Sequence, residues 1–187
     1  MQVDLSRFNN SWYSPGRPFA TQALWFFLGL PLLRARWNPS SGFRRGLLRL
    51  FGARIGPGVV IKPGVRVKYP WLLEIGDHSW IGEDAWIDNL TTVAVGAHVC
   101  ISQGAYLCTG NHDWSDPAFG LIVGAITLHA GSWVGAQCII CPNTILETGA
   151  IVTAGSVATG VLEQMGIYAG NPAIKVKTRV MQPRLNK

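Results

Sequence analysis

IGDHSWIGEDAWI, residues 75–87, contains two complete hexapeptides that each begin with isoleucine and glycine. The same six-residue spacing extends to both sides of this stretch, as in IGPGVV at 55–60, ISQGAY at 101–106 and VTAGSV at 152–157. An amphipathic helix repeats its apolar residues every three or four positions, so a period of six excludes one. The aliphatic positions fall in sets of three spaced by six, and the first three sets start 20 residues apart because two residues are added at one corner. The sets are 55, 61 and 67; 75, 81 and 87; 95, 101 and 107; 128, 134 and 140; and 146, 152 and 158.

A short strand followed by a turn accounts for each hexapeptide, and three such units complete one triangular coil of a parallel β-helix. The spacing therefore predicts an all-β fold of about five coils from about residue 53 to about residue 160, with Ile55, Ile75 and Val95 stacked in one interior column. The glycines are expected to adopt the positive φ that the corners require. A β-sandwich is the alternative, but it would show irregular spacing and a period of two.

The composition is typical of one glycine-rich folded unit with few charges. The 187 residues include 22 glycines and only 14% charged residues, and a surface this poor in charge favours oligomerisation. Eleven lysines and arginines and no acid lie between Arg7 and Lys68, whereas nine acids and no lysine or arginine lie between Tyr69 and Ile174. A nucleic-acid-binding protein would carry basic residues along its repeats, so these acidic repeats argue against that class.

The hexapeptides over roughly 52–180, the segment CISQGAYLCTGNHDWSDPAFG at 100–120 and AGNPA at 169–173 resemble the hexapeptide-repeat acyltransferases. Within that family they are most similar to exopolysaccharide O-acetyltransferases of the colanic-acid type. The resemblance implies a left-handed β-helix and a homotrimer whose active sites lie between adjacent β-helices. It also implies acetyl-CoA as co-substrate.

The repeat is interrupted after Leu107, because the next aliphatic residue of the phase is Leu128. A long loop on a rigid scaffold is a common place for functional residues, and His112 lies at its root. Imidazole accepts a proton near neutral pH, as a base that activates a hydroxyl must. The T-G-N-H segment at 109–112 resembles the histidine motif of the family, which implies that His112 is the catalytic general base. Cys108 is a rival candidate, because a thiol could act as a nucleophile.

Several residues near the loop are candidate contacts to the acceptor hydroxyl. The resemblance places Asn89 near that hydroxyl, and Asp88 is its neighbour and an alternative contact. Asn89 could instead be a corner residue in a left-handed turn conformation. Asp113 and Asp116 either orient His112 or hold the loop, since aspartates also cap turns. Trp114 is expected to close over the groove of a neighbouring subunit.

The final coils supply candidate contacts to CoA. Its pantetheine arm needs exposed backbone groups and its phosphates need a cation. The resemblance implies that the V-G-A and T-A-G-S segments hold the arm and that the lysines after A-G-N-P meet the phosphates, although these could also belong to a solvated basic tail. A lysine of related proteins is replaced by Gly160. The implied contacts are Gly135, Ala136, Ala154, Gly155, Thr159, Lys175 and Lys177.

The cysteines and the other histidines do not predict a metal site. Cys138 and Cys141 form a C-x-x-C, but no second pair completes a zinc site. His78 and His98 occupy the same repeat position on successive coils and could stack roughly 4.8 Å apart. We expect them and His129 to coat the walls of the β-helix.

Residues 1–52 are predicted to form an N-terminal arm and helical cap, and residues 53–187 the β-helix domain with a C-terminal tail. An apolar run from Ala23 to Leu33 is shorter than the about 20 residues that span a bilayer. The helix either caps the open first coil or lies in a membrane interface, with the arginines that follow against anionic lipid. No secretory signal opens the chain. These features predict a cytoplasmic protein, with peripheral contact to the inner face of the membrane as an option.

The sequence thus predicts an acetyl-CoA-dependent O-acetyltransferase that acts by direct transfer on a sugar hydroxyl in exopolysaccharide or surface-polysaccharide biosynthesis. The sugar could be free, nucleotide-linked or lipid-linked. An antibiotic or a free small sugar is the alternative acceptor, because relatives with such acceptors share the scaffold. A non-catalytic or metal-binding hexapeptide scaffold is the alternative of another class. It would need three converging histidines, and only the pair of His78 and His98 is available.

Overall fold

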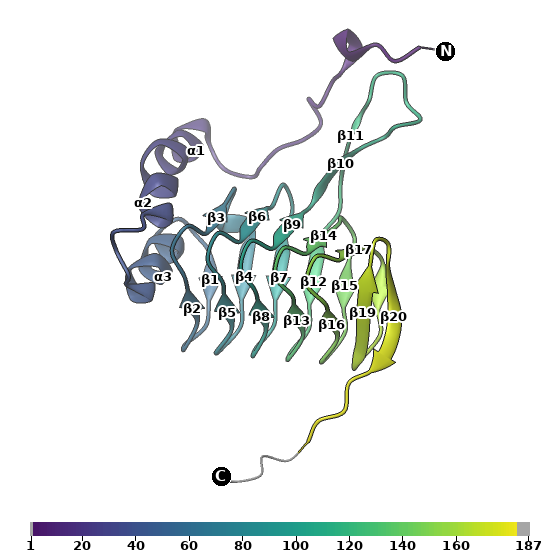
Figure 1. The fold of residues 1–187 in the computed structure, drawn as a ribbon. Helices are drawn as coiled ribbons and strands as arrows, with labels where there is room; N and C mark the ends of the chain where they lie inside the picture. The colour runs from purple at the N-terminus through teal and green to yellow at the C-terminus, as the bar shows by residue number, and fades with distance from the viewer. Residues whose placement is uncertain (1, 183–187) are drawn as a thin grey trace.

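Five triangular coils and a partial sixth follow one another along the chain in the computed structural model, which describes residues 2–182 (Figure 1). Each complete coil contributes one short parallel strand to each of three faces, and the architecture is that of a left-handed parallel β-helix. Ile55 pairs in register with Ile75, and Ile75 with Val95, and all three side chains are buried. The predicted fold class and interior column are therefore confirmed. The part of the predicted tail from residue 183 lies outside the described residues.

The strands of the three faces lie in coil order, so that each aliphatic residue of the hexapeptide phase stacks on its counterpart in the next coil. Face A contains β1 (Arg54–Ile55), β4 (Leu73–Ile75), β7 (Val93–Val95), β12 (Ile126–Leu128), β15 (Ile145–Leu146) and β18 (Val161–Leu162). Face B contains β2 (Val60–Ile61), β5 (Trp80–Ile81), β8 (Cys100–Ile101), β13 (Trp133–Val134), β16 (Ile151–Val152), β19 (Gly166–Gly170) and the antiparallel β20 (Ala173–Thr178). Face C contains β3 (Arg66–Val67), β6 (Trp86–Asp88), β9 (Tyr106–Cys108), β14 (Ile139–Ile140) and β17 (Val157–Ala158).

The partial sixth coil extends the predicted five. Leu162 stacks on Leu146 in face A, and Tyr168 stacks on Val152 in face B. Only four positions separate Ala158 from Leu162, so the corner between them breaks the period of six. The hexapeptide phase could not detect a coil that begins with this short corner.

Glycine serves the coils in two different ways. Gly58 adopts a φ of +67° at a corner, as expected, but the equivalent corner position in the next coil is His78, with a φ of 56°. Where a glycine directly follows an inward aliphatic residue, as at Gly76, Gly82 and Gly135, close packing against the next coil requires it instead. A Cβ on Gly76 would lie 2.6 Å from the backbone nitrogen of Ala97 in the next coil. The expectation of positive φ is therefore correct for some corner glycines. Gly76 is a glycine for a different reason, because the backbone of the next coil leaves no space for a Cβ atom.

The interruption after Leu107 is a projecting hairpin. Its strands β10 (Gly110–His112) and β11 (Leu121–Val123) pair antiparallel, and His112 lies opposite Leu121. The hairpin leaves the body where face C of the third coil ends, and the N-terminal segment with η1 (Leu5–Arg7) runs beside it (Figure 1). The scaffold thus fixes the root of a segment that stands away from the coils.

Helices cover the first coil. α1 (Phe19–Leu24), the π-helical turn η2 (Trp25–Gly29) and α2 (Leu30–Arg34) follow without a break, and α3 (Ser41–Leu50) contacts β1 and β2. Trp25, Leu33 and Leu48 are buried with the core of the β-helix, and the Trp25 indole donates a hydrogen bond of 3.1 Å to the carbonyl of Val67. The helices bury the apolar end that a first coil would otherwise expose. No helix of residues 2–182 is long and apolar enough to cross a membrane.

Candidate active site

His112 is held by the hairpin that carries it. Its Nδ1 lies 2.9 Å from the carbonyl oxygen of Phe119, and the two rings stack with centroids 4.6 Å apart. A carbonyl oxygen only accepts hydrogen bonds, so in the neutral imidazole this contact places the proton on Nδ1 and leaves the lone pair on Nε2. His112 is half-buried. The arrangement presents Nε2 as a proton acceptor in a fixed ring orientation.

Aspartates of the hairpin hold its tip and not the imidazole. Asp113 accepts hydrogen bonds from the backbone nitrogen and hydroxyl of Ser115, and these bonds lower the pKa of its carboxyl. Asp116 accepts from the backbone nitrogens of Ala118 and Gly120. The geometry agrees with the loop-holding alternative for both aspartates. The side chain of Trp114 is 83% exposed at the tip of the hairpin.

The N-terminal arm packs along the same hairpin. The backbone nitrogen of Asp4 donates a hydrogen bond of 2.8 Å to the carbonyl of Pro117. The ring of Phe8 lies 5.7 Å from the imidazole of His112, at an angle of 59°. His112 is therefore flanked by Phe119 from its own hairpin and by Phe8 from the start of the chain.

Asp88 forms a polar cluster at the end of β6, beside the root of the hairpin. Its carboxylate lies 3.0 Å from the ammonium of Lys68 and accepts a hydrogen bond of 3.1 Å from the hydroxyl of Tyr106. Its carbonyl accepts from the backbone nitrogen and hydroxyl of Thr109, the first residue of the T-G-N-H segment. Burial, aided by Cys108 and Asp88, raises the pKa of Tyr106, so the phenol keeps its proton and remains a donor.

Asn89 has no polar group left for a ligand. Its side chain is fully buried, its amide nitrogen donates to the carbonyl of Tyr69, and its oxygen accepts from the nitrogen of the same residue. Asn89 also does not adopt the left-handed conformation considered for it. Asn89 therefore bridges two coils and does not contact the acceptor, which corrects the prediction. Of this pair of residues, only Asp88 lines a cavity.

Four of the residues implied in CoA binding lie together at the corner between faces B and C. Gly135 and Ala136 follow β13, and Ala154 and Gly155 follow β16 in the next coil. The two corners are joined by a hydrogen bond of 2.9 Å from the nitrogen of Gly155 to the carbonyl of Ala136. Ala154 and Gly155 are exposed, so this corner offers backbone groups to a ligand.

The remaining three implied CoA contacts lie elsewhere. Thr159 follows β17 at the corner between faces C and A. Lys175 and Lys177 lie on β20 and are both exposed, but Lys175 is engaged 2.6 Å from the carboxylate of Glu163. Within residues 2–182, no carboxylate lies at ion-pair distance from Lys177. Lys177 is therefore the freer of the two cations.

The other candidate groups have structural partners. The thiol of Cys108 donates to the carbonyl of Gly110, and Cys138 is buried. The rings of His78 and His98 stack 5.4 Å apart at an angle of 14°, as their shared repeat position predicts. No group of three or more histidine, cysteine or acidic side chains in the described part of the chain could hold a metal ion.

His112 and the B–C corner lie on different edges of the same prism. The hairpin leaves the edge between faces C and A, so the width of face C separates its root from Gly135 and Gly155. A reaction that used both would bring together edges of two different molecules. Sequence reasoning did not find the Phe119 carbonyl, which has no side-chain signature, or Phe8, which lies far from the motif in sequence.

No family model matches the sequence. The chain is 38% identical over 146 residues to a protein of Escherichia coli named as a colanic acid biosynthesis acetyltransferase, covering 77% of this chain and 80% of that protein. A hexapeptide-repeat acetyltransferase of Vibrio cholerae, solved with acetyl coenzyme A, superposes with a TM-score of 0.78 at 19% identity over 87% of this chain and 88% of the other. A maltose O-acetyltransferase of Clostridium difficile superposes with a TM-score of 0.71 at 18% identity, over 87% and 88%.

Proposed function

Because this chain belongs to the hexapeptide-repeat acetyltransferases, we propose that it transfers the acetyl group of acetyl-CoA to a sugar hydroxyl, with His112 as the general base. The hydrogen bond from His112 Nδ1 to the Phe119 carbonyl carries this proposal. It fixes the tautomer and the ring, as a second polar partner does for catalytic histidines generally. The named role of the Escherichia coli relative supports an acceptor in exopolysaccharide or surface-polysaccharide biosynthesis.

The proposed reaction is a direct transfer. His112 Nε2 takes the proton of the acceptor hydroxyl while its oxygen attacks the thioester carbonyl. The tetrahedral intermediate collapses with cleavage of the carbon–sulfur bond, and the imidazolium returns its proton to the departing thiolate of CoA. The products are the acetyl ester and free CoA, and no acyl-enzyme forms. Asp88, held by Lys68 and Tyr106, is the proposed contact to the acceptor.

The active site is proposed to lie between two copies of the chain in a homotrimer. His112 stands on the C–A edge, whereas the exposed backbone of Ala154 and Gly155 stands on the B–C edge. One copy would supply the base and the next would supply the groove for the pantetheine arm, with Lys177 as the free cation for the phosphates. Such a head-to-tail contact closes into a ring when the rotation is three-fold. Trp114, exposed at the tip of the hairpin, would reach the neighbouring copy.

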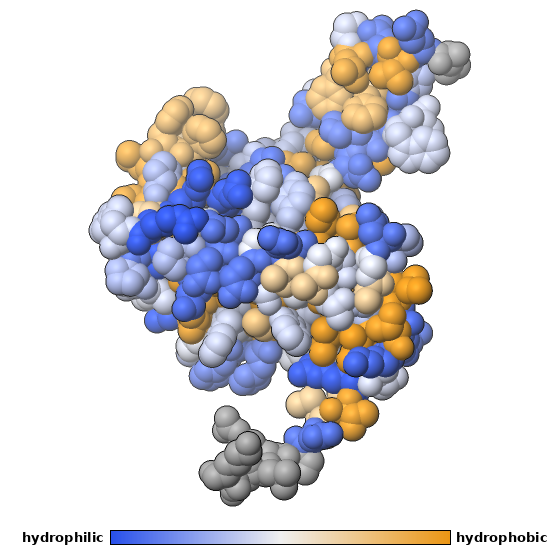
Figure 2. All heavy atoms as spheres, viewed as in Figure 1, coloured by the Kyte–Doolittle hydropathy of each residue, from blue (hydrophilic) through white to orange (hydrophobic). Residues whose placement is uncertain are grey.

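We also propose that the N-terminal helix touches the inner face of the membrane. Leu24, Leu28 and Leu32 recur every four residues and are 50%, 58% and 41% exposed. Figure 2 shows hydrophobic side chains gathered over this helical end of the molecule. The acid-free stretch from Arg7 to Lys68 supplies cations for anionic lipid. Flotation with phosphatidylglycerol vesicles should recover the wild-type protein and less of Leu28→Ser, whereas equal recovery contradicts the contact.

Turnover of acetyl-CoA with His112→Ala tests the chemistry. We expect kcat to fall by about 10²–10⁴, as when a general base is removed, while CoA affinity is retained. Nucleotide sugars, lipid-linked sugars, free sugars and polysaccharide fragments should be screened first to find a turned-over acceptor. Cys108→Ala is the matched control and should remain active. Trapping an acetyl-cysteine at Cys108 in an active His112→Ala protein would contradict the mechanism.

A further inference from the structure

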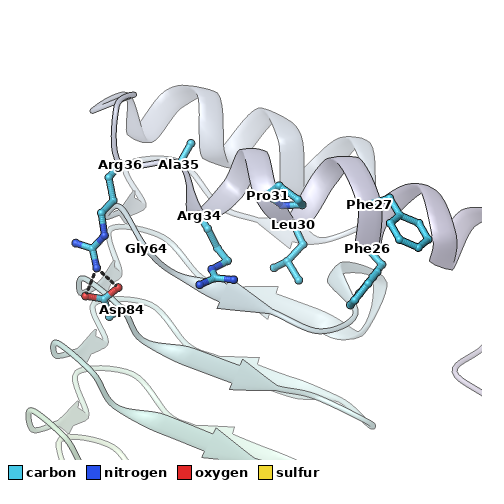
Figure 3. Close-up of a pocket in the computed structure, with 9 residues that line it drawn as sticks. All are labelled: Phe26, Phe27, Leu30, Pro31, Arg34, Ala35, Arg36, Gly64 and Asp84. Atoms are coloured by element: carbon cyan, nitrogen blue, oxygen red, sulfur yellow. Dashed lines mark hydrogen bonds and ion pairs between the residues drawn. The ribbon is translucent and has the colours of Figure 1, made fainter.

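A groove with apolar and charged walls runs between the N-terminal helix and face C of the first two coils. It consists of two hollows of about 690 Å³ and about 490 Å³ that share Phe26, Phe27 and Leu30 as wall residues. Phe26, Leu30 and Arg34 point from the helix toward the strands (Figure 3). We call this feature the cap groove. Its size falls within the usual range for sites that take a small organic ligand.

Two cations in the walls of the cap groove lack an acidic partner. Arg36 is paired with Asp84 at 2.6 Å, and Lys68 with Asp88 at 3.0 Å. Within the described residues, no carboxylate lies at ion-pair distance from Arg34 or Arg66. The guanidinium of Arg66 instead stacks over the Trp86 ring, 4.8 Å from its centroid. The groove therefore combines apolar walls with a net positive charge.

This combination selects one chemistry for the occupant. Guanidinium groups bind phosphate oxygens through paired hydrogen bonds, and two of them match the charge of a diphosphate. Phe26, Phe27 and Leu30 would remain in contact with water beside a bare sugar nucleotide, so the apolar wall favours a hydrocarbon chain. A bilayer surface is too broad to enter the space between the helix and face C.

The groove also leads to the candidate active site. Asp88 lines its smaller hollow, and the carbonyl of Asp88 accepts a hydrogen bond from Thr109 at the root of the hairpin that carries His112. A ligand whose chain and diphosphate occupied the groove would therefore direct its sugar toward this edge. We propose that the cap groove binds an acceptor in which the sugar is joined through a diphosphate to an apolar chain. This inference rests on the proposed function and names the class of its acceptor.

Binding of farnesyl diphosphate to the full-length protein tests the groove without any turnover. Titration calorimetry below the micellar concentration should show binding, while farnesol and inorganic diphosphate should each bind about tenfold more weakly or less, because each lacks one half of the recognised chemistry. Equal binding of farnesol would contradict the role of the arginines. Equal binding of inorganic diphosphate would contradict the role of the apolar wall.

Matched variants locate the site. Arg66→Gln and Phe27→Ser should each weaken farnesyl diphosphate binding about tenfold. Arg54→Gln, in the first strand of face A, and Leu28→Ser, in the exposed leucine stripe, should bind as the wild type does. Phe27 is 70% exposed, so its replacement leaves the core intact. Equal losses in the control variants would place the ligand elsewhere and overturn the proposal.

Two further measurements separate the possible failures. If the protein floats with phosphatidylglycerol vesicles but does not bind monomeric farnesyl diphosphate, the helical end contacts membranes only. This result would overturn the proposal that the cap groove binds a ligand. His112→Ala should bind farnesyl diphosphate normally. Acetyl transfer to a soluble sugar without farnesyl diphosphate binding would overturn only the groove, whereas binding without transfer to any acceptor would overturn only the proposed function.

Discussion

The Phe119 carbonyl determines which nitrogen of His112 carries the proton. Its 2.9 Å contact to Nδ1 leaves Nε2 free, and the stacked Phe119 ring restricts rotation of the imidazole. The sequence motif predicted His112 as the base, but it could not predict its partner, because any residue at position 119 has the same carbonyl. Phe119 itself has a φ of 55°, which is unusual for a bulky residue and follows from the turn that Asp116 caps.

Tertiary contacts also give two neighbouring polar residues, Asp88 and Asn89, different environments. Asn89 and Asp88 are adjacent in sequence, yet one is fully buried between coils and the other lines a cavity. The family resemblance gave Asn89 as an acceptor contact, with its neighbour Asp88 as the alternative. The distinction depends on the exchange of two hydrogen bonds between the Asn89 amide and the Tyr69 backbone, a contact across one coil.

Lys177→Ala should raise the KM for acetyl-CoA about 2- to 10-fold and leave the KM for the acceptor unchanged. An exposed, charge-assisted bond to phosphate has a modest effect, and loss of uniform binding changes KM without kcat. Lys175→Ala is the matched control, because Lys175 is already engaged with Glu163. Initial-rate kinetics with each substrate varied separately make the comparison. An equal rise for both substrates would argue against the assignment.

At the scale of the elements, the six-residue period was sufficient to predict the register of the first five coils. Every inward aliphatic residue of the repeat lies where the period of six places it once the two-residue insertions after Val67 and Ile87 are counted, because each coil packs only on its neighbours. The rule failed where the corner was shortened, because Leu162 comes only four residues after Ala158, and it did not predict the hairpin geometry after Leu107. Non-repeating segments are set by contacts distant in sequence, such as the one between Asp4 and Pro117.

Close packing between coils predicts that two glycine-to-alanine substitutions change the free energy of unfolding in opposite directions. A Cβ on Gly76 would lie 2.6 Å from the Ala97 backbone nitrogen, whereas one on Gly46 in α3 would meet no atom within 4 Å. Gly76→Ala should lower the free energy of unfolding by about 2 kcal/mol or more, because backbone must move to accommodate it. Gly46→Ala should raise it by about 0.5–1 kcal/mol through helix propensity. Urea unfolding followed by circular dichroism measures both, and a neutral Gly76→Ala would contradict the packing argument.

At the scale of the whole molecule, the prism keeps the edges that carry the candidate site residues apart. The hairpin with His112 leaves the C–A edge, and the exposed corner at Ala154 and Gly155 belongs to the B–C edge. A rigid solenoid cannot fold these edges together, so a shared site requires a second copy. The low charge of the composition favoured association, but the location of the proposed contact depends on which edge carries the hairpin.

Complementation between two inactive variants tests this account most directly. His112→Ala removes the proposed base, and Ala154→Trp fills the exposed corner that a second copy is proposed to contribute. Each variant alone should be inactive. Trimers formed from equal amounts of both should recover about a quarter of the wild-type acetyl-transfer rate. Random assembly places an intact histidine beside an intact corner at about one interface in four. Recovery at this level supports a base and a groove from different copies. Mixed trimers that remain inactive, while wild-type protein treated in the same way is active, would contradict the shared site.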